Sequence, residues 1–485
     1  MKPERKSQIP NPTPQGWVHL GLLLLAGCAV GPDYEEPKTE SAGAFRNAEG
    51  MSTDPAEIAW WKGFADPKLD DLIARAASGN LGVKAAAALL REARALYGLE
   101  TYDLFPTVTT RADYTRQMLS KATFLSDVPR DDRVFGYYSA GFDAYWELDF
   151  FGRVRRSMEA ASAEVGLADA TRRDVLLSVL AEIARSWFEL KGARNRQAVA
   201  SRNIANEEEA LRLTIARFEA GRGAELDVER ARTQLRSTQA ALPPIEEDVA
   251  RARHRLAVLL GTSPHAFDVD TGPPAPPDAL PKLIAIGKPE DLLRRRPDIR
   301  RAERRLAAAT ARIGVATADL FPRVTIAGTY GPQAQKLSDL THAGAAAYSF
   351  GPTISWAAFD LGRVAARIRA ADARAEADLY AYQETVLRAL EETENALTSF
   401  GRERARRDAL SGAATSAARA AELAETRYQA GAADFLATLD ARRTLIVLQL
   451  QLADSQTRVM TSLIAVYKAL GGGWEIAEPP PRSSP

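Results

Sequence analysis

The sequence contains little of what catalysis or metal binding needs. Its 485 residues include one cysteine and four histidines, which excludes a disulfide framework, an iron–sulfur cluster and a zinc site with several thiolate ligands. No histidine stands in a recognisable triad or metal-ligand spacing, and no glycine-rich phosphate-binding motif is present. The sequence therefore predicts a protein that is not an enzyme and that has no cofactor and no metal site.

The chain also lacks net charge, because 63 Lys and Arg residues balance 63 Asp and Glu residues. A neutral chain does not present the positive surface that attracts nucleic-acid phosphates, so we expect no nucleic-acid partner. Residues 294–305 contain seven arginines, but Asp298 and Glu303 interrupt the run. This pattern favours a solvated helix start over a phosphate site.

An apolar stretch near the N-terminus is too short to span a membrane. Residues 17–26 follow a basic segment and end in Leu25-Ala26-Gly27-Cys28, which is typical of a signal peptide, residues 1–27, and resembles a bacterial lipobox. We therefore expect cleavage before Cys28 and lipidation of its thiol, which gives the protein an acyl anchor. Ala29, rather than Asp, favours sorting to the outer membrane. The alternative is an ordinary signal peptide with a chance cysteine.

The rest of the chain is a tandem repeat. Leu104-Phe105-Pro106 matches Leu320-Phe321-Pro322 at an offset of 216 residues. From Trp146 onward the matching residues lie 210 positions apart. The pairs at offset 210 include Trp146 with Trp356, Gly152-Arg153-Val154 with Gly362-Arg363-Val364, Phe218 with Tyr428, Gly221 with Gly431, and Leu260-Gly261 with Leu470-Gly471. We therefore divide the mature chain into an N-terminal extension (28–59), a first repeat (60–262), a proline-rich linker (263–288), a second repeat (289–473) and a tail (474–485).

Each repeat contains one very long predicted helix. Residues 157–220 and residues 364–430 contain no proline and almost no glycine, and strong helix formers dominate them. At 1.5 Å per residue such a helix reaches about 100 Å, so it needs partners along its length. A near-heptad spacing predicts coiled-coil packing with those partners, as in Leu176, Leu180, Ile183, Trp187 and Leu190.

Glycine and proline mark where these helices end. Gly221 and Gly431 each follow a long helix, and the helical pattern resumes a few residues later. We therefore predict a helical hairpin with a tight tip in each repeat. Pro243 and Pro244 predict an interruption in the return helix of the first repeat.

Four segments alternate between apolar and polar residues, as β-strands with one apolar face do. They are residues 107–114, 137–146, 324–330 and 348–356. Strands of about ten residues with this alternation suit a membrane barrel with a wet lumen, although an antiparallel sheet on a soluble core shows the same pattern. Four strands cannot close a barrel, and an open edge in lipid leaves backbone groups unsatisfied. A spanning barrel therefore requires an oligomer; a wide lumen favours three chains over two, and the sequence alone does not decide the count.

The ends of these strands carry four further candidates. Trp146 and Trp356 close two of the apolar alternations, where the aromatic girdle of a membrane barrel would lie, and the alternative is a buried core tryptophan. Asp149 and Asp360 precede the long helices, so we predict that both cap a helix N-terminus.

Several local motifs together resemble one known family. They are Gly27-Cys28-Ala29-Val30-Gly31-Pro32-Asp33-Tyr34 with Pro37; Trp60-Trp61 with Phe64 and Asp66-Pro67; Arg295-Arg296-Pro297-Asp298-Ile299-Arg300 with Ala302-Glu303; and Arg427-Tyr428 with Gly431 and Leu439-Asp440-Ala441. With these motifs the chain, over almost its whole length after residue 25, resembles the TolC-like outer membrane factors. Within them it is similar to the lipoprotein branch that serves resistance-nodulation-division efflux systems.

The resemblance implies a mainly α-helical fold with a membrane β-barrel. It implies a homotrimer whose 12-stranded barrel, built from four strands per chain, lies in the outer membrane of a Gram-negative bacterium. A long coiled-coil helical barrel of twelve helices would extend into the periplasm. The implied partners are outer-membrane lipid, a periplasmic adaptor protein that docks at the tips Gly221 and Gly431, and an inner-membrane resistance-nodulation-division pump.

The resemblance also implies a periplasmic gate. Its matching residues here are Asp440, Arg443, Arg427 and Tyr428, with three copies of Asp440 forming an acidic ring. Three converging carboxylates repel one another and attract cations, so the ring could filter ions as well as gate. Ala437 stands where some members have a second acidic ring, which weakens the case for a cation block. The alternative is a surface Asp440 paired with Arg443 along one helix.

Two functions follow from these expectations. The first is a passive channel of an efflux or export system, opened at its tip by the adaptor and the pump. The second is a non-conducting, lipid-anchored coiled-coil scaffold of the cell envelope. Because a scaffold has no need of four alternating strands between its helices, the sequence favours the channel. The exported substrate leaves no mark in the sequence.

Overall fold

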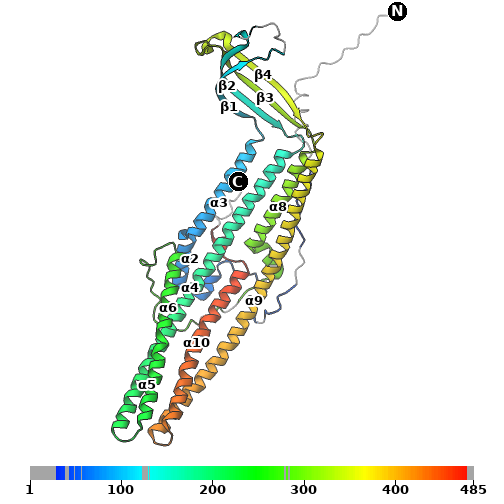
Figure 1. Cartoon of the computed structure of the whole chain (residues 1–485). Coiled ribbons are helices and arrows are strands. Elements are labelled where there is room, and N and C mark those ends of the chain that lie inside the picture. Colours follow the sequence, from blue (N-terminus) through cyan, green and yellow to red (C-terminus); the bar gives the residue numbers. More distant parts are fainter. Residues whose placement is uncertain are drawn as a thin grey trace, which may run out of the picture. The chain divides into compact units, whose positions relative to one another are not determined.

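The computed structural model describes residues 29–38, 43–48, 50–55, 57–122, 129, 131–277, 280–281 and 284–477. The predicted signal peptide, the lipidation site Cys28 and the end of the predicted tail lie outside the described residues. The described residues form long helices and one four-stranded antiparallel sheet (Figure 1). No helix within them has both the length and the apolar character required to cross a bilayer.

The elements follow one another in the same order twice, which confirms the tandem repeat. In the first repeat they are η1 (Trp60–Phe64), α2 (Pro67–Gly79), α3 (Leu81–Tyr102), β1 (Thr107–Met118), η2 (Asp131–Arg133), β2 (Val134–Leu148), α4 (Arg153–Glu219), α5 (Glu225–Ala240) and α6 (Leu242–Leu259). In the second they are α7 (Pro289–Arg295), α8 (Pro297–Ala318), β3 (Arg323–Ala334), η3 (Leu337–Thr341), η4 (Ala343–Ala345), β4 (Ala346–Ser355), α9 (Leu361–Gln429), α10 (Phe435–Ala469) and η5 (Trp474–Ala477). The two long helices lie where the composition predicts them.

The chain folds into two compact units that do not coincide with the two repeats. Among the described residues, the sheet unit comprises residues 29–37 and those within Leu90–Leu167 and Ala302–Tyr382. The hairpin unit comprises Lys38–Leu89, Ala168–Arg301 and the chain from Gln383 onward. Each repeat contributes to both units because the boundaries fall inside α3, α4, α8 and α9.

In the sheet unit the strands pair in the order β1-β2-β3-β4, and every pair is antiparallel. β2 contains 15 residues and is longer at its start than the alternation predicts, because Val134 and Phe135 pair with Met118 and Gln117 at the end of β1. The outer strands β1 and β4 each pair with one neighbour only within the described residues.

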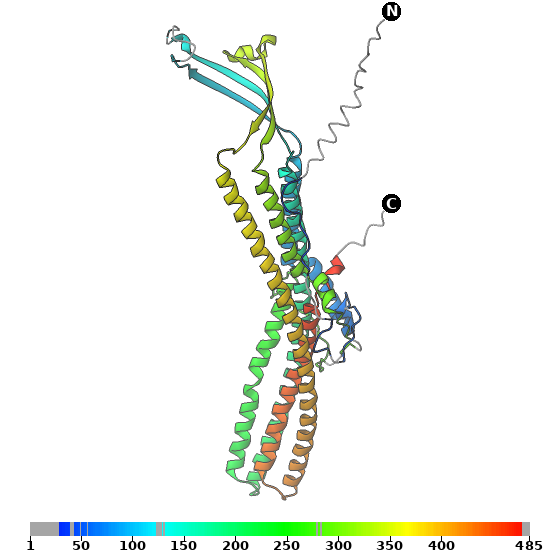
Figure 2. The ribbon, with the colours of Figure 1, turned by 90° about the vertical axis from the view of Figure 1, so that its right-hand side faces the viewer.

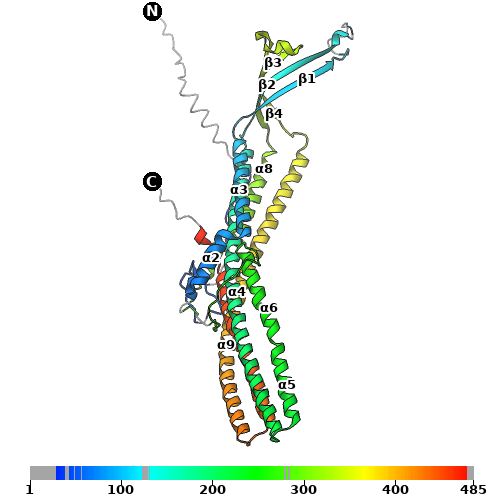
Figure 3. The same cartoon turned by 90° about the vertical axis from the view of Figure 1, so that its left-hand side faces the viewer.

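In the hairpin unit, α4 with α5 and α9 with α10 form two helical hairpins. Figure 2 shows α9 and α10 as orange and red ribbons that turn at one end, and Figure 3 shows the green ribbons of α4 and α5 turning in the same way. α5 ends at Ala240 and α6 begins at Leu242, which confirms the interruption predicted from Pro243 and Pro244. The near-heptad positions of α4 are its core, since Leu176, Leu180, Ile183, Trp187 and Leu190 are all buried.

One expectation from the arginine run is wrong. Arg296 is 8% exposed and donates to the carboxylates of Asp298 (2.8 Å) and Glu392 (2.7 Å) and to the carbonyl of Ala469 (2.9 Å). Arg301 likewise pairs with Asp174 at 2.8 Å. Arg296 and Arg301 therefore tie the start of α8 to neighbouring helices, because buried guanidinium groups require acceptors on every side, whereas Arg294, Arg300 and Arg305 are exposed as expected.

Candidate functional site

The two faces of the sheet differ in chemistry. Residues paired across strands share a face, and the registers place Arg111, Asp113, Asp143, Thr329 and Ser349 on one side. There Arg111 lies 3.1 Å from Asp113 and 3.9 Å from Asp143, and the hydroxyls of Thr329 and Ser349 are 2.8 Å apart. This face is polar throughout its centre.

The opposite face is apolar and exposed. The registers place on it Val108, Phe142, Tyr330, Tyr348, Phe350 and Ile354, each more than half exposed. Exposed apolar side chains in one continuous patch mark a surface that contacts lipid or another protein. An antiparallel sheet with one apolar and one polar face is the arrangement of a membrane barrel strand.

The two predicted interface tryptophans make equivalent hydrogen bonds. The indole nitrogen of Trp146 in β2 donates to the carbonyl of Leu104 at 2.9 Å, and that of Trp356, just after β4, donates to the carbonyl of Leu320 at 3.0 Å. Trp356 is 55% exposed, so the buried-core alternative is wrong for it. An apolar ring with a satisfied N–H is the character of residues at a membrane interface.

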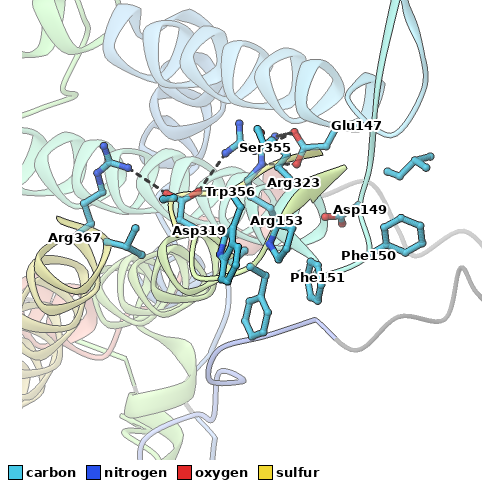
Figure 4. Close-up of a pocket in the computed structure, with 16 residues that line it drawn as sticks. Glu147, Asp149, Phe150, Phe151, Arg153, Asp319, Arg323, Ser355, Trp356 and Arg367 are labelled. Carbon is cyan, nitrogen blue, oxygen red and sulfur yellow. Dashed lines mark hydrogen bonds and ion pairs between the residues drawn. The ribbon is translucent and has the colours of Figure 1, made fainter. Parts of the chain in front are cut away.

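A cavity of about 280 Å³ lies where the strands meet the helices (Figure 4). Figure 4 shows charged side chains on its lining that form ion pairs with one another. Arg153 donates twice to Glu147 at 2.7 Å, and Asp319 lies 3.2 Å from Arg323 and 3.4 Å from Arg367. The cavity is charged but balanced, so these groups hold the junction together and leave no net charge for a ligand.

The two predicted helix caps behave differently. Both carboxylate oxygens of Asp149 accept backbone N–H groups, from Val154 and Arg155 at 3.0 Å, as an N-terminal cap does. The carboxylate of Asp360 lies 2.9 Å from the guanidinium of Arg363, and it is the backbone carbonyl of Asp360 that accepts from the Arg363 N–H. The capping prediction is therefore confirmed for Asp149 and wrong for the side chain of Asp360.

Residues 29–37, here called the N-terminal strap, are bound within the sheet unit mainly by Arg156, an arginine that the sequence did not single out. Arg156 of α4, with a side chain only 5% exposed, donates to the carbonyls of Val30 (3.1 Å) and Gly31 (3.2 Å) and to Asp33 (2.7 Å). A Cβ on Gly31, whose φ is +91°, would come within 2.4 Å of the backbone of Gly314.

The strap continues through Tyr34, which donates to Glu303 at 2.6 Å. Burial, and then the hydrogen bond to the Glu303 carboxylate, raise the pKa of Tyr34 above its ordinary value of 10.0. Tyr34 therefore stays a neutral donor at any pH at which the protein works.

The hairpin tips have the backbone that their glycines predict. Gly221 and Gly431 have φ of +70° and +73°, and each donates its N–H three residues back, to Phe218 and Tyr428. The N–H groups one residue later donate five residues back, which completes the Schellman motif. A Cβ on either glycine would meet nothing within 4 Å, so the positive φ alone requires glycine.

The four predicted gate residues lie near the second tip but are not bonded to one another within the described chain. Asp440, Arg443 and Arg427 are exposed, and no ion pair joins Asp440 to Arg443 within the described chain. Asp440 is thus a surface residue, as the alternative expects, but the pair with Arg443 does not form in the described chain, and the gate stays a prediction. Asp434, the N-cap of α10, accepts from the N–H of Ala437 at 2.9 Å.

Tyr428 connects the two hairpins instead. Its ring lies 4.4 Å from the guanidinium of Arg217 on α4 and 5.6 Å from the ring of Phe435. Burial raises the pKa of Tyr428, and Arg217 opposes the rise.

No group of three or more His, Cys, Asp or Glu side chains that could hold a metal ion occurs in the described ranges. The features that remain are a two-faced sheet with two free edges, a charged but balanced junction and two helical tips. Of these, the sheet with one apolar and one polar face is the feature that a membrane barrel requires.

Comparison with known proteins identifies the class. The family model for the outer membrane efflux protein matches residues 72–262 and 289–472, and the chain belongs to that family. It is an outer-membrane channel component of an efflux system in the outer membrane of a Gram-negative bacterium. Its family is one of efflux ducts and is not known for an enzymatic activity.

Individual relatives match over nearly the whole chain. The outer membrane protein OprJ of Pseudomonas aeruginosa is 31% identical over 461 residues, which is 93% of this chain and 94% of the relative. Nodulation protein T of Rhizobium leguminosarum bv. trifolii is 31% identical over 93% of this chain and 96% of its own. These matches cover both repeats.

Solved structures agree with the fold. The outer-membrane channel OprN is 42% identical, with a TM-score of 0.86 over 92% of this chain and 100% of that chain. The open state of the MtrE outer membrane channel of Neisseria gonorrhoeae is 30% identical, with a TM-score of 0.82 over 92% and 99% of the two chains. The TolC-like architecture expected from the sequence motifs is confirmed.

Proposed function

We propose that three copies of this chain close into a passive duct for small molecules, with a barrel of twelve strands. The observation that carries the proposal is the four-stranded sheet with free edges at β1 and β4 and one exposed apolar face. Backbone groups at an open edge cannot be left unpaired in lipid, so β4 of one copy must pair with β1 of the next. The polar face around Arg111 and Asp143 would then line the lumen.

We further propose that the duct is anchored by lipid on Cys28 after removal of residues 1–27. The support is the position of the N-terminal strap, where Val30 donates to the carbonyl of Phe151 at 3.2 Å. The residue after the lipidated cysteine would thus lie at the strand–helix junction. Trp146, near the end of β2, and Trp356, just after β4, are proposed as the aromatics of that membrane interface.

The gate is proposed at the tip of the second hairpin. Asp440 and Arg443 are exposed and free of each other, so both are available to neighbouring copies. Arg427 and Tyr428 come from the other side of the same hairpin. A ring of three Asp440 carboxylates would need such cations to stay closed, because like charges at short range repel.

A periplasmic adaptor and an inner-membrane resistance-nodulation-division pump are proposed to open this gate at the tips Gly221 and Gly431. The cargo is proposed to be selected by the pump. Relatives of about equal similarity carry different cargo names, since one at 31% identity is a pyoverdine export protein and one at 30% is a toluene efflux protein.

The proposal is tested by mass and conductance measured on one preparation. We expect a mass of three chains in detergent and small, mostly closed events in a planar bilayer. Asp440→Ala should enlarge the events, whereas Asp408→Ala, which removes an exposed carboxylate of α9, should not. A monomer or dimer without conductance in every variant would favour the scaffold, and unchanged events in both Asp440→Ala and Arg443→Ala would refute the gate alone.

A further inference from the structure

A cavity lined by both polar and apolar side chains lies between the two helical hairpins within the hairpin unit. Its volume is about 330 Å³, and its lining comes from α4, α9 and α10. Three carboxamides line it, from Asn203, Asn206 and Gln449. A polar cavity of this size admits several water molecules, so protons can reach any titratable group on its lining.

Glu207 of α4 is the unusual member of this lining. It is 3% exposed, and no hydrogen bond or ion pair within 4 Å joins its carboxylate to the described part of the chain. One helical turn earlier, the side-chain nitrogen of Asn203 is also buried without a partner. A carboxylate that faces only a small cavity and has no donor from the chain is less well solvated when ionised than one at the surface.

The charges that face Glu207 leave it without a counterion of its own. The cavity has one cation, Arg442 of α10, which donates to Glu425 of α9. Glu425 also accepts from Gln429 at 3.0 Å. The carboxylates of Glu207 and Glu425, which lie on different hairpins, therefore have one guanidinium between them, and that guanidinium is paired with Glu425.

The other two acids of the lining have partners elsewhere. Glu209 of α4 accepts from Arg212 at 2.9 Å, and Glu422 of α9 accepts from Arg419 at 2.7 Å. Both pairs are exposed, so they contribute little to the field inside the cavity. The electrostatic balance of the cavity thus depends on Glu207, Glu425 and Arg442.

Protonation of Glu207 removes the unpaired negative charge from the cavity. Burial raises the pKa of Glu207 above its ordinary value of 4.5, Arg442 lowers it and Glu425 raises it again. A carboxyl whose pKa is raised in the packed state destabilises that state when ionised, and the packed state gains stability as the pH falls through the raised value. The gain in stability of the packed state is complete below about pH 4.5, the ordinary pKa of the carboxyl.

We propose that Glu207 is a proton-binding switch at the joint between the two hairpins, holding them together when protonated and loosening them when ionised. The consequence for conduction rests on the proposed function, in which a gate at the tip of the second hairpin closes the duct, and adds that the gate opens more easily when the two hairpins are loosened. The closed state is then favoured in acid and the gate is easier to open at neutral and alkaline pH.

The test compares wild type, Glu207→Gln and Glu209→Gln in planar bilayers from about pH 8 to about pH 5 on the tip side. The glutamine at 207 copies the protonated carboxyl in shape and charge. We expect the wild-type open fraction to fall with pH, by about tenfold for each pKa unit that separates the packed from the separated state. Glu207→Gln should show the low open fraction at every pH, and Glu209→Gln should follow the wild type.

A second measurement tests the proposal and does not depend on channel conductance. Amide hydrogen exchange of α10 around Arg442 is compared between wild type and Glu207→Gln at the same pH, so that the chemical exchange rate cancels. Slower exchange in the variant at about pH 8, with a difference that shrinks as the pH is lowered to about 5, supports the switch. Equal exchange at both pH values, or a wild-type conductance profile in Glu207→Gln, overturns it. Absence of conductance in all three proteins would refute the duct and leave the exchange result to decide the switch.

Discussion

Replacing Asp66 by alanine should loosen the start of α2 and its attachment to α4. Asp66 is the N-cap of α2 and accepts from the N–H groups of Lys68 (3.1 Å) and Leu69 (3.4 Å). Its second oxygen accepts from the indole of Trp187 at 2.9 Å and the ammonium of Lys191 at 3.0 Å. The Asp66 carboxylate therefore both caps α2 and joins α2 to α4.

The magnitude follows from the groups that alanine would leave without a partner. Loss of an N-cap costs about 1 kcal/mol. The indole N–H of Trp187, a residue 1% exposed, would be buried without an acceptor, at about 1–3 kcal/mol. The total is about 2–4 kcal/mol of local stability. Asp66→Asn keeps an acceptor oxygen and should lose less.

The assay is amide hydrogen exchange of α2, read as the free energy of local opening. Burial raises the pKa of Asp66, but the hydrogen bonds from Trp187 and Lys191 outweigh it and leave the pKa below its ordinary value of 3.8. Stability from this group is therefore fully present above that ordinary value and is lost as the pH falls below it through the lowered pKa of the folded state. Exchange in Asp66→Ala within about 0.5 kcal/mol of wild type would refute the reasoning.

Three further outcomes are expected. Arg156→Ala should release the N-terminal strap and speed its cleavage by protease, since three acceptors would lose their donor; unchanged cleavage would contradict this. Gly431→Ala should raise exchange at the tip through about 1–2 kcal/mol of left-handed strain, whereas Gly401→Ala, in an open helical position, should not. Gly192→Ala should lower the thermal midpoint, because its Cβ would overlap the side chain of Thr457; an unchanged midpoint would show that α4 and α10 can move apart freely.

Elements that depend on local chemistry were predictable from the sequence. The positive φ at Gly221 and Gly431 follows from the helix signals on both sides, and the break before Leu242 follows from two prolines. Strand alternation predicted the two faces of the sheet, because side chains along a strand point to opposite sides whatever the strand packs against.

Partnerships between distant residues were not predictable. The arginine run looked solvated, yet Arg296 is buried because α10 and Glu392 bring acceptors to it from far along the chain. Asp440 and Arg443 stand at helical spacing but do not pair in the described structure, and Tyr428 instead contacts Arg217 of the other hairpin.

The sequence by itself determined the repeat, the long helices, the strands, the tips and the family, because each follows from periodicity, from glycine and proline, or from local motifs. Only the tertiary structure decided which charges are paired and which are left alone. Glu207 shows the difference, since its sequence neighbours are those of an ordinary exposed helix. Its burial arises only where α9 and α10 cover it and Glu425 holds the one nearby arginine. The pairing of charges depends on packing between helices, and a single sequence does not encode that packing in any local pattern.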